Sequence, residues 1–298
     1  MSDLPVTARG FVNTWQCDEN DHLNVQFYTG WADEASPHLH AMLGLDGAQF
    51  RGVAVEDSIR YHREMIAADG VEVRSAPLQV TGERLAAYHE IRNGYDGTVA
   101  ATIRRVTLCR SLDSANAPWP QDFVTAAQAR QIELPEQARA RTVGTRPLPR
   151  PTLAQAFAAG AFETGRGTIH AGECAVNGRI TPRAIFGRMS DAAGFVWQGL
   201  GFDRAGMREQ RLGTVVVEYR CRYMARLGTG SRFVLLSGLL TATDRILHLV
   251  HFIYDADSGR LAAVADGVGM KLDLEARRSA KLTDEDRTRL AGRVMMTF

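Results

Sequence analysis

The chain of 298 residues contains the same pattern twice, and this repeat is the feature that most constrains its fold. When the sequence is shifted by 157 positions, residues 9–46 align with residues 166–203, and nine of these 38 pairs are identical. Chance would give about two or three identities at average amino-acid usage. The identical pairs are Arg9/Arg166, Gly10/Gly167, Cys17/Cys174, Asn20/Asn177, Gly30/Gly187, Ala35/Ala192, Leu43/Leu200, Gly44/Gly201 and Asp46/Asp203.

A second block follows at a shift of 162 positions, where Arg60-Tyr61 aligns with Arg222-Tyr223 and His89 with His251. The larger shift means that the second copy has five additional residues between Asp203 and Tyr223. Two copies in the same order predict a duplicated domain. Because two copies are too few for a solenoid, we expect a fused pseudo-dimer.

Each copy has the pattern of one helix followed by an antiparallel sheet, which predicts an α+β fold rather than βαβ units. An extended segment (9–15 and 167–174) precedes an amphipathic run that ends at Leu-Gly in both copies. The β-rich segments that follow are 53–64, 71–81, 85–93 and 98–110 in the first copy, and 214–225, 232–242, 246–254 and 260–272 in the second. Asp96-Gly97 and Ser258-Gly259 are typical of hairpin turns.

We therefore expect domain 1 at residues 1–112, a linker at 113–165 and domain 2 at 166–298. Within the linker, residues 123–140 have the pattern of a polar helix, and the Pro/Arg-rich residues 146–151 are typical of a stiff, extended connector. Residues 284–294 predict a short charged helix at the C-terminal end.

Composition narrows the functional classes. The net charge of +1, from 35 basic and 34 acidic residues, gives no general reason to expect nucleic acid as a partner. No apolar run is long enough for a transmembrane helix, so we expect no membrane association, and residues 1–10 lack the apolar segment of a signal peptide. The four cysteines show no CxxC spacing, so we expect reduced thiols, a cytoplasmic location, no metal and no cofactor.

The segment 15–31, WQCDENDHLNVQFYTGW, places four polar side chains directly before the first helix: Asp18, Asn20, His22 and Asn24. A helix N-terminus offers free N–H groups and a partial positive charge to a developing oxyanion. A carboxylate beside it provides a nucleophile or a general base. The pattern suits attack on a carbonyl, although Asp18 also fits a simple turn or capping role.

This segment resembles the signature of the 4-hydroxybenzoyl-CoA thioesterase-like family of hotdog proteins, in which D-x-x-G-H-V-N-N precedes a Tyr and an acidic residue on the helix. It is also similar to the plant acyl-carrier-protein thioesterases, whose motif alternates Asp, Asn and His before V-N and Tyr-x-x-Trp. Asp21 and Val25 depart from these patterns, and the motif stands in the first copy rather than the second. The resemblance implies a tandem double hotdog, each copy a long helix wrapped by an antiparallel sheet.

The resemblance implies an acyl-CoA thioesterase in which Asp18 is the nucleophile or general base, assisted by His22 and Asn20. Backbone N–H groups near residues 24–27 would polarise the carbonyl. Because Asn177 repeats Asn20, a structural turn role for Asn20 is favoured over a chemical one. Residues expected to contact the substrate are Asn24, Val25, Tyr28, Trp31 and, from the second copy, Asp191.

The second copy has lost the motif, with Ala175 in place of Asp18, Arg179 for His22, Thr181 for Asn24 and Ile185 for Tyr28. We therefore expect one active pocket of the Asp18 type, with the second copy as its wall. Asp191 on the second helix is a candidate for another site, with a capping or exposed role favoured. A homo-oligomer of pseudo-dimers is expected by analogy with hotdog proteins.

Three alternatives remain for the function: an acyl-ACP thioesterase, a hotdog hydratase, or a non-catalytic acyl-CoA-binding protein. The hydratase pattern D-x-N-P-x-H shares three letters with residues 18–22 but has a Pro that this segment lacks. The paired strand histidines, His89 and His251, are interpreted as structural. Five arginines of the first copy are candidates for contacts with carrier phosphates: Arg60, Arg63, Arg84, Arg104 and Arg105.

Overall fold

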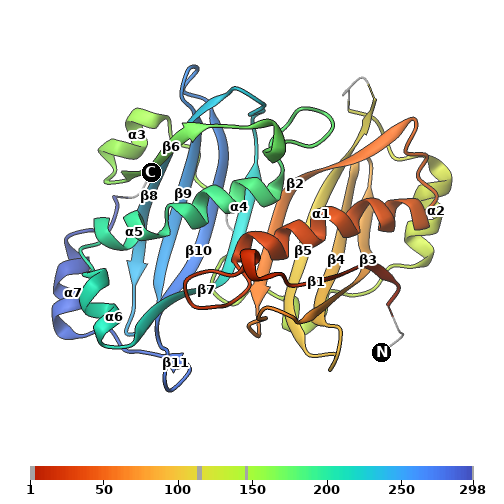
Figure 1. Cartoon of the computed structure of the whole chain (residues 1–298). Helices are drawn as coiled ribbons and strands as arrows, with labels where there is room; N and C mark the ends of the chain where they lie inside the picture. The colour runs from red at the N-terminus through yellow and green to blue at the C-terminus, as the bar shows by residue number, and fades with distance from the viewer. Residues whose placement is uncertain (1–3, 113–115, 145–146, 297–298) are drawn as a thin grey trace. The chain divides into compact units, whose positions relative to one another are not determined.

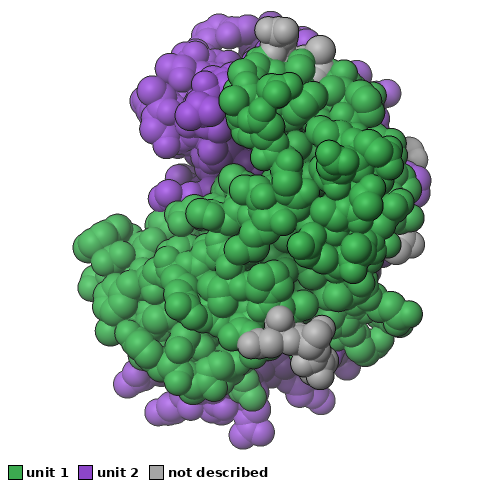
Figure 2. All heavy atoms as spheres, turned by 90° about the vertical axis from the view of Figure 1, so that its right-hand side faces the viewer, with its two compact units in different colours: residues 1–140 green, residues 141–298 purple. Residues whose placement is uncertain are grey.

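The computed structural model describes residues 4–112, 116–144 and 147–296. It divides into two compact units, residues 1–140 and residues 141–298, which Figure 2 shows in separate colours. Unit 1 contains the first copy of the repeat and unit 2 the second. Residues 113–115 and 145–146 of the expected linker lie outside the described part.

Unit 1 has an antiparallel sheet in the order β1-β3-β4-β5-β2 and one long helix, α1, lying along one face of it (Figure 1). The bounds are β1 (Val6–Phe11), α1 (Val25–Met42), β2 (Phe50–Tyr61), β3 (Gly70–Thr81), β4 (Arg84–Asn93) and β5 (Val99–Ser111). The four predicted β-rich segments of the first copy are confirmed, and β1 is an additional strand pairing with β3.

Helix α1 forms where the sequence combines capping signals with an apolar stripe. The Asn24 side chain accepts a hydrogen bond from the Gln26 N–H and caps the first turn. Buried residues recur at helical spacing and turn one face of α1 toward the sheet: Tyr28, Trp31, Ala32, Ala35 and Leu39. The helix ends before Gly44, whose φ of +86° gives the left-handed conformation common just after a helix.

A buried ion-pair network joins α1 to the two strands β2 and β5. The guanidinium of Arg105, on β5, contacts both carboxylate oxygens of Asp57 on β2 at 2.8 Å. It also reaches Asp33 of α1, with 2.7 Å between Nη1 and Oδ1. Arg105 is 2% exposed and Asp57 is fully buried, so neither charge is solvated by water. A buried charge needs such partners to be tolerated.

The linker helix is shorter than the sequence pattern predicts. Helix α2 covers only Gln121–Ala129, and a 3₁₀ turn at Glu136–Ala138 follows Pro135. The expected helix over 123–140 is therefore wrong: α2 already ends at Ala129, and Pro135 excludes a helix that continues to residue 140 because it lacks the N–H for the hydrogen-bond ladder. The linker packs on unit 1: Trp119 stacks on Phe123, with ring centroids 4.5 Å apart, and both contact the buried His40 of α1.

Unit 2 repeats the sheet in the order β7-β10-β9-β8-β6, with β11 pairing with β10. The bounds are β6 (Phe162–Thr168), β7 (Leu212–Tyr223), β8 (Arg232–Ala242), β9 (Leu247–Asp255), β10 (Leu261–Asp273) and β11 (Arg278–Ser279). The predicted strands of the second copy are confirmed. The predicted C-terminal helix is α7 (Asp284–Ala291).

The helix of unit 2 is broken, whereas the sequence pattern predicts one helix ending at Leu200-Gly201. The chain forms α4 (Pro182–Asp191) and α5 (Ala193–Gly199), separated at Ala192. Several glycines and Ser190 lower the helix propensity of this stretch. The five additional residues fall in a further short helix, α6 (Arg204–Glu209), which is capped by the Asp203 side chain.

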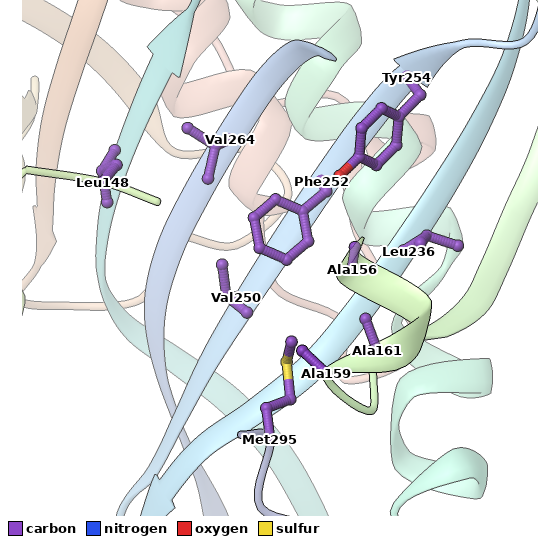
Figure 3. Close-up of a cluster of buried hydrophobic side chains, with 10 residues drawn as sticks. All are labelled: Leu148, Ala156, Ala159, Ala161, Leu236, Val250, Phe252, Tyr254, Val264 and Met295. Atoms are coloured by element: carbon purple, nitrogen blue, oxygen red, sulfur yellow. The ribbon is translucent and has the colours of Figure 1, made fainter. Parts of the chain in front are cut away.

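The sheet face of unit 2 that lies away from its broken helix is covered by the linker and the C-terminal segment. Helix α3 (Leu153–Ala158) places Ala156 over β8 and β9, and Met295 packs beside it (Figure 3). Beneath them lie the buried side chains Leu236, Val250, Phe252 and Tyr254. Residues of the linker therefore complete a hydrophobic core in unit 2 as well as in unit 1.

We expect Arg105→Met to destabilise unit 1 strongly. The substitution leaves the buried Asp57 carboxylate without its guanidinium, which typically costs about 3–5 kcal/mol. The matched control is Arg9→Met, because Arg9 pairs with Glu72 at the surface and its side chain is 71% exposed. Such a pair contributes about 1 kcal/mol or less. Urea denaturation followed by tryptophan fluorescence measures both changes; equal losses would contradict the prediction.

The buried His40 makes the stability of the fold depend on pH. Burial, together with the nearby charge of Arg105, lowers the pKa of His40 to about 4. In the unfolded chain a histidine takes up its proton near pH 6.5. The free energy of unfolding therefore falls as the pH is lowered from about 6.5 to about 4. We expect His40→Gln to reduce this dependence by about one proton, measured as the change of the unfolding free energy with pH.

Candidate active site

Residues 17–23 form a tight turn directly before α1. Cys17 and Leu23 form an antiparallel bridge, and the Asp18 N–H donates to the carbonyl oxygen of His22 at 2.8 Å. Asp21 closes the turn with a φ of +61°, a left-handed conformation that Asp adopts more readily than most residues. The turn brings the Asp18 carboxylate against the backbone N–H groups of Asn20 and His22.

Hydrogen bonds fix only one of the two oxygens of the Asp18 carboxylate. Its Oδ1 accepts the backbone N–H of Asn20 at 2.8 Å and that of His22 at 3.4 Å. Its Oδ2 accepts no hydrogen bond from the described residues. Burial raises the pKa of Asp18, while these two N–H groups oppose the rise. A partly desolvated carboxylate with one oxygen fixed and the other open suits a base or nucleophile.

His22 is nearly buried and contacts a carboxylate that the sequence motif does not include. Its Nε2 lies 3.5 Å from Oε2 of Glu64, which follows β2 in the loop of residues 62–69. The His22 side chain is 11% exposed and that of Glu64 is 37% exposed. Sequence reasoning missed Glu64 because it lies outside the contiguous motif.

The first amides of α1 are not equally available to a ligand. The Gln26 N–H donates to the Asn24 side chain, and the Phe27 N–H donates to the Asn24 carbonyl oxygen. The Val25 N–H has no hydrogen-bond partner among the described residues. Of the amides expected at residues 24–27, Val25 is therefore the one that can donate to a carbonyl oxygen of a substrate.

Tyr28 and Trp31 point into unit 1 from α1. Tyr28 is 3% exposed and packs edge-to-face on Tyr61, with ring centroids 5.3 Å apart. Burial raises the pKa of Tyr28, with the charge of Asp18 among the smaller causes, so its hydroxyl stays protonated near neutral pH. Trp31 lies against β1 at Gly10, where an added Cβ would be 2.0 Å from the indole ring. Trp31 thus packs against β1 and lies on a part of α1 away from the turn of residues 17–23.

Asp191, the candidate from the second copy, is the last residue of α4 in unit 2 and is exposed. Two of the candidate phosphate ligands are engaged elsewhere. Arg105 is buried in the network described above, which makes it unsuitable for a ligand at the surface. Arg60 donates to the backbone carbonyls of Gln137 and Arg139 in the linker.

The histidines interpreted as structural are buried and partnered in both units. His89 Nδ1 lies 2.7 Å from the Ser75 hydroxyl, and His251 Nδ1 lies 2.8 Å from the Ser237 hydroxyl. Burial lowers the pKa of both histidines. They therefore remain neutral and internal, and the interpretation from the repeat is confirmed.

Unit 2 builds the same turn without the same side chains. The Ala175 N–H donates to the Arg179 carbonyl at 2.8 Å, and Cys174 bridges Ile180 as Cys17 bridges Leu23. Gly178, with a φ of +69°, takes the place of Asp21. The N-cap is Thr181, and the residue equivalent to Val25 is Pro182, which has no N–H. The second copy thus keeps the backbone and lacks both the carboxylate and the free amide.

Within the described parts of the chain, no group of three or more His, Cys, Asp or Glu side chains is arranged to hold a metal ion. None of the described helices is long and apolar enough to cross a membrane.

A long helix packed against an antiparallel sheet, repeated in sequence, is the arrangement of a hotdog-like fold. A family model, the thioesterase-like superfamily, matches residues 12–128 and 169–290. The chain therefore belongs to the thioesterase-like superfamily, and each copy of the repeat matches the family separately. No curated protein sequence matches the chain.

Solved structures with the same fold include three described as thioesterases. A putative oleoyl thioesterase from Lactobacillus plantarum matches with a TM-score of 0.65 and 15% identity, covering 91% of this chain and 98% of its own. A 12:0-ACP thioesterase from Umbellularia californica matches with a TM-score of 0.65 and 10% identity, covering 89% of this chain and 93% of its own. An acyl-ACP thioesterase from Bacteroides thetaiotaomicron matches with a TM-score of 0.57 and 11% identity, covering 88% of this chain and 96% of its own. At these identities the likeness establishes the fold.

Proposed function

We propose that the chain hydrolyses an acyl-CoA thioester at the turn before α1, with Asp18 as nucleophile or general base. The family supports thioester hydrolysis as the general reaction. The carbonyl oxygen of the substrate would accept a hydrogen bond from the Val25 N–H, which stabilises the negative charge that develops during attack. Breaking the C–S bond releases the thiolate of CoA, which takes up the proton removed from water. Whether the two hotdog-like units pair as a tandem double hotdog stays a prediction of the repeat.

The observation that carries this proposal is the comparison of the two turns. If Asp18 served only to form the turn, a copy with alanine at that position would be expected to lose it. Instead Ala175 occupies a turn with the same 2.8 Å backbone hydrogen bond. In that copy the side chain of Asn177 accepts the Arg179 N–H. The turn is therefore kept when Asn177 accepts the N–H that Asp18 accepts in unit 1, so forming the turn does not require an aspartate at position 18, which favours a chemical role for Asp18.

We expect Asp18→Asn to reduce kcat/KM by about 10²–10⁴-fold toward acyl-CoA substrates, the usual contribution of a positioned base. Thiol release measured with a chromogenic reagent over a panel from acetyl-CoA to palmitoyl-CoA gives the rates. Asp21→Asn is the matched control, because it makes the same charge change in the same turn and Asn tolerates a positive φ.

An unchanged rate in Asp18→Asn would overturn the assignment of Asp18. No release above background from any acyl-CoA by the parent protein, combined with measurable acyl-CoA binding, would favour a non-catalytic binding protein. Release only from acyl-ACP would identify the carrier protein as the true substrate form.

We also expect Val25→Pro to reduce kcat by about 10²–10³-fold while the fold is retained, because it removes only the amide proposed for the oxyanion. Proline is well tolerated at the first position of a helix, and Pro182 occupies the equivalent position in unit 2. Val25→Ala, which keeps the N–H, is the control. Circular dichroism and thermal denaturation check the fold; equal rates in the two folded variants would exclude the Val25 amide.

A further inference from the structure

Two large apolar side chains are exposed to water beside the turn that carries Asp18. Trp15, in the 3₁₀ turn Thr14–Gln16, is 79% exposed, and Ile66, in the loop of residues 62–69, is 54% exposed. The other three tryptophans of the chain are at most 9% exposed. Apolar surface left in water is unfavourable, and neighbouring exposed apolar side chains often mark a binding surface.

Backbone contacts hold both side chains at the turn. Ile66 forms an antiparallel bridge with His22. The thiol of Cys17 is hydrogen-bonded to the backbone of the residue that follows Ile66, which ties this loop to the segment that carries Trp15. Trp15 precedes Asp18 by three residues, so their Cα atoms lie within about 11 Å of each other. Both side chains therefore border the candidate active site.

Unit 2 keeps the backbone of this region without either side chain. At the positions of Trp15 and Ile66 it has Gly172 and Gly228. Gly172 still lies in a 3₁₀ turn, and Gly228 still forms a bridge with the turn before α4. The turn of unit 2 exposes Val176, which is smaller than either side chain of unit 1. The fold therefore does not require Trp15 or Ile66, and the two are present in the copy that carries the proposed catalytic carboxylate.

We propose that Trp15 and Ile66 contact the pantetheine arm of the substrate, the uncharged chain that joins the thioester sulfur to the phosphate of CoA or of an acyl carrier protein. The inference rests on the proposed function, which places the thioester carbonyl at Asp18 and the Val25 N–H. The phosphate on the carrier is charged and stays in water, so the thiol side of the thioester remains at the surface. The exposed side chains beside the site therefore meet the part of the carrier next to the sulfur.

The chemistry of the arm suits these two side chains. Pantetheine carries two methyl groups and two amides along its length, so both an apolar surface and a hydrogen-bond donor can bind it. Trp15 provides a flat apolar ring, and its indole N–H donates to none of the described residues. Ile66 adds an aliphatic surface. CoA and acyl carrier proteins present the same arm, so this contact serves both carriers.

The first test uses Trp15 as its own reporter and needs no turnover. Because the other tryptophans are buried, acrylamide in solution quenches mainly Trp15, and subtracting the signal of Trp15→Phe isolates its emission. We expect pantetheine and CoA each to protect Trp15 from quenching in a saturable manner. Absence of protection by both ligands would overturn the proposal. Protection that needs the acyl group, or that follows protein concentration instead of ligand, would overturn it as well.

The second test compares thioesters with and without the arm. We expect Trp15→Ala and Ile66→Ala each to raise KM about tenfold for acyl-CoA and for acyl carrier protein, with kcat nearly unchanged, because the contact is equal in the ground and transition states. With an S-acyl-N-acetylcysteamine, which lacks the pantoate part of the arm, the loss should be less than about twofold. Gly172 shows that the turn forms without a large side chain at this position.

Met42→Ala is the matched control. Met42 is an apolar side chain, 49% exposed, at the last position of α1. It lies about 25 Å along the helix from the turn, so its KM values should not change.

Equal losses with the short thioester, or losses confined to one carrier, would overturn the assignment to the arm. Protection of Trp15 in a protein that hydrolyses no acyl thioester would uphold the contact and reject the proposed function. Turnover that depends on Asp18, with neither variant impaired and no protection of Trp15, would uphold the function and reject the contact.

Discussion

The ion pairs of Arg105 are the constraint on which the architecture of unit 1 depends. One guanidinium joins Asp33 of α1, Asp57 of β2 and its own strand β5, so the helix, and with it the turn before its N-terminus, is fixed relative to the sheet. Arg105 and Asp57 are shielded from water, so water cannot replace either partner of this pair, whereas Asp33 is partly exposed. Asp57 and Arg105 lie directly opposite each other in the β2–β5 pairing, so the network joins α1 to these two strands at one place in the sheet.

Unit 2 has uncharged residues at the positions equivalent to Asp57 and Arg105. The positions of Asp57 and Arg105 are occupied by Tyr219 and Gly267, which are also directly opposite each other. The Tyr219 ring fills the space left by the glycine, where an added Cβ would be 2.3 Å from a ring carbon. Its hydroxyl lies 3.4 Å from Nε2 of His251. An aromatic ring and a missing side chain thus replace an ion pair, and the helix they support is broken.

The strands could be predicted well from the sequence because the pattern of each strand occurs in both copies of the repeat. The helix lengths were predicted less well: the linker helix ends at Ala129, before Pro135, and the glycine-rich helix of the second copy is interrupted at Ala192. At the site, the contiguous motif indicated a polar turn at Asp18 and His22, whereas Asn24, predicted to contact the substrate, has a side chain that caps α1. The motif did not reveal Glu64 or the burial of Arg105, because both follow from contacts between segments distant in the sequence.

Pro182, the first residue of α4, affects both the start of that helix and the N–H groups available there. A helix that begins with Pro182 is well initiated, since the ring fixes φ and removes an amide that would otherwise lack a partner. In the proposed mechanism, the same exchange removes the amide that would donate to the carbonyl oxygen of the substrate, so restoring an aspartate at Ala175 alone leaves the second turn without that donor. Each such replacement is compatible with the turn as a structural element but removes a group that the proposed reaction uses. Under the proposed function, no single substitution would therefore give the second copy both the carboxylate and the amide of the first.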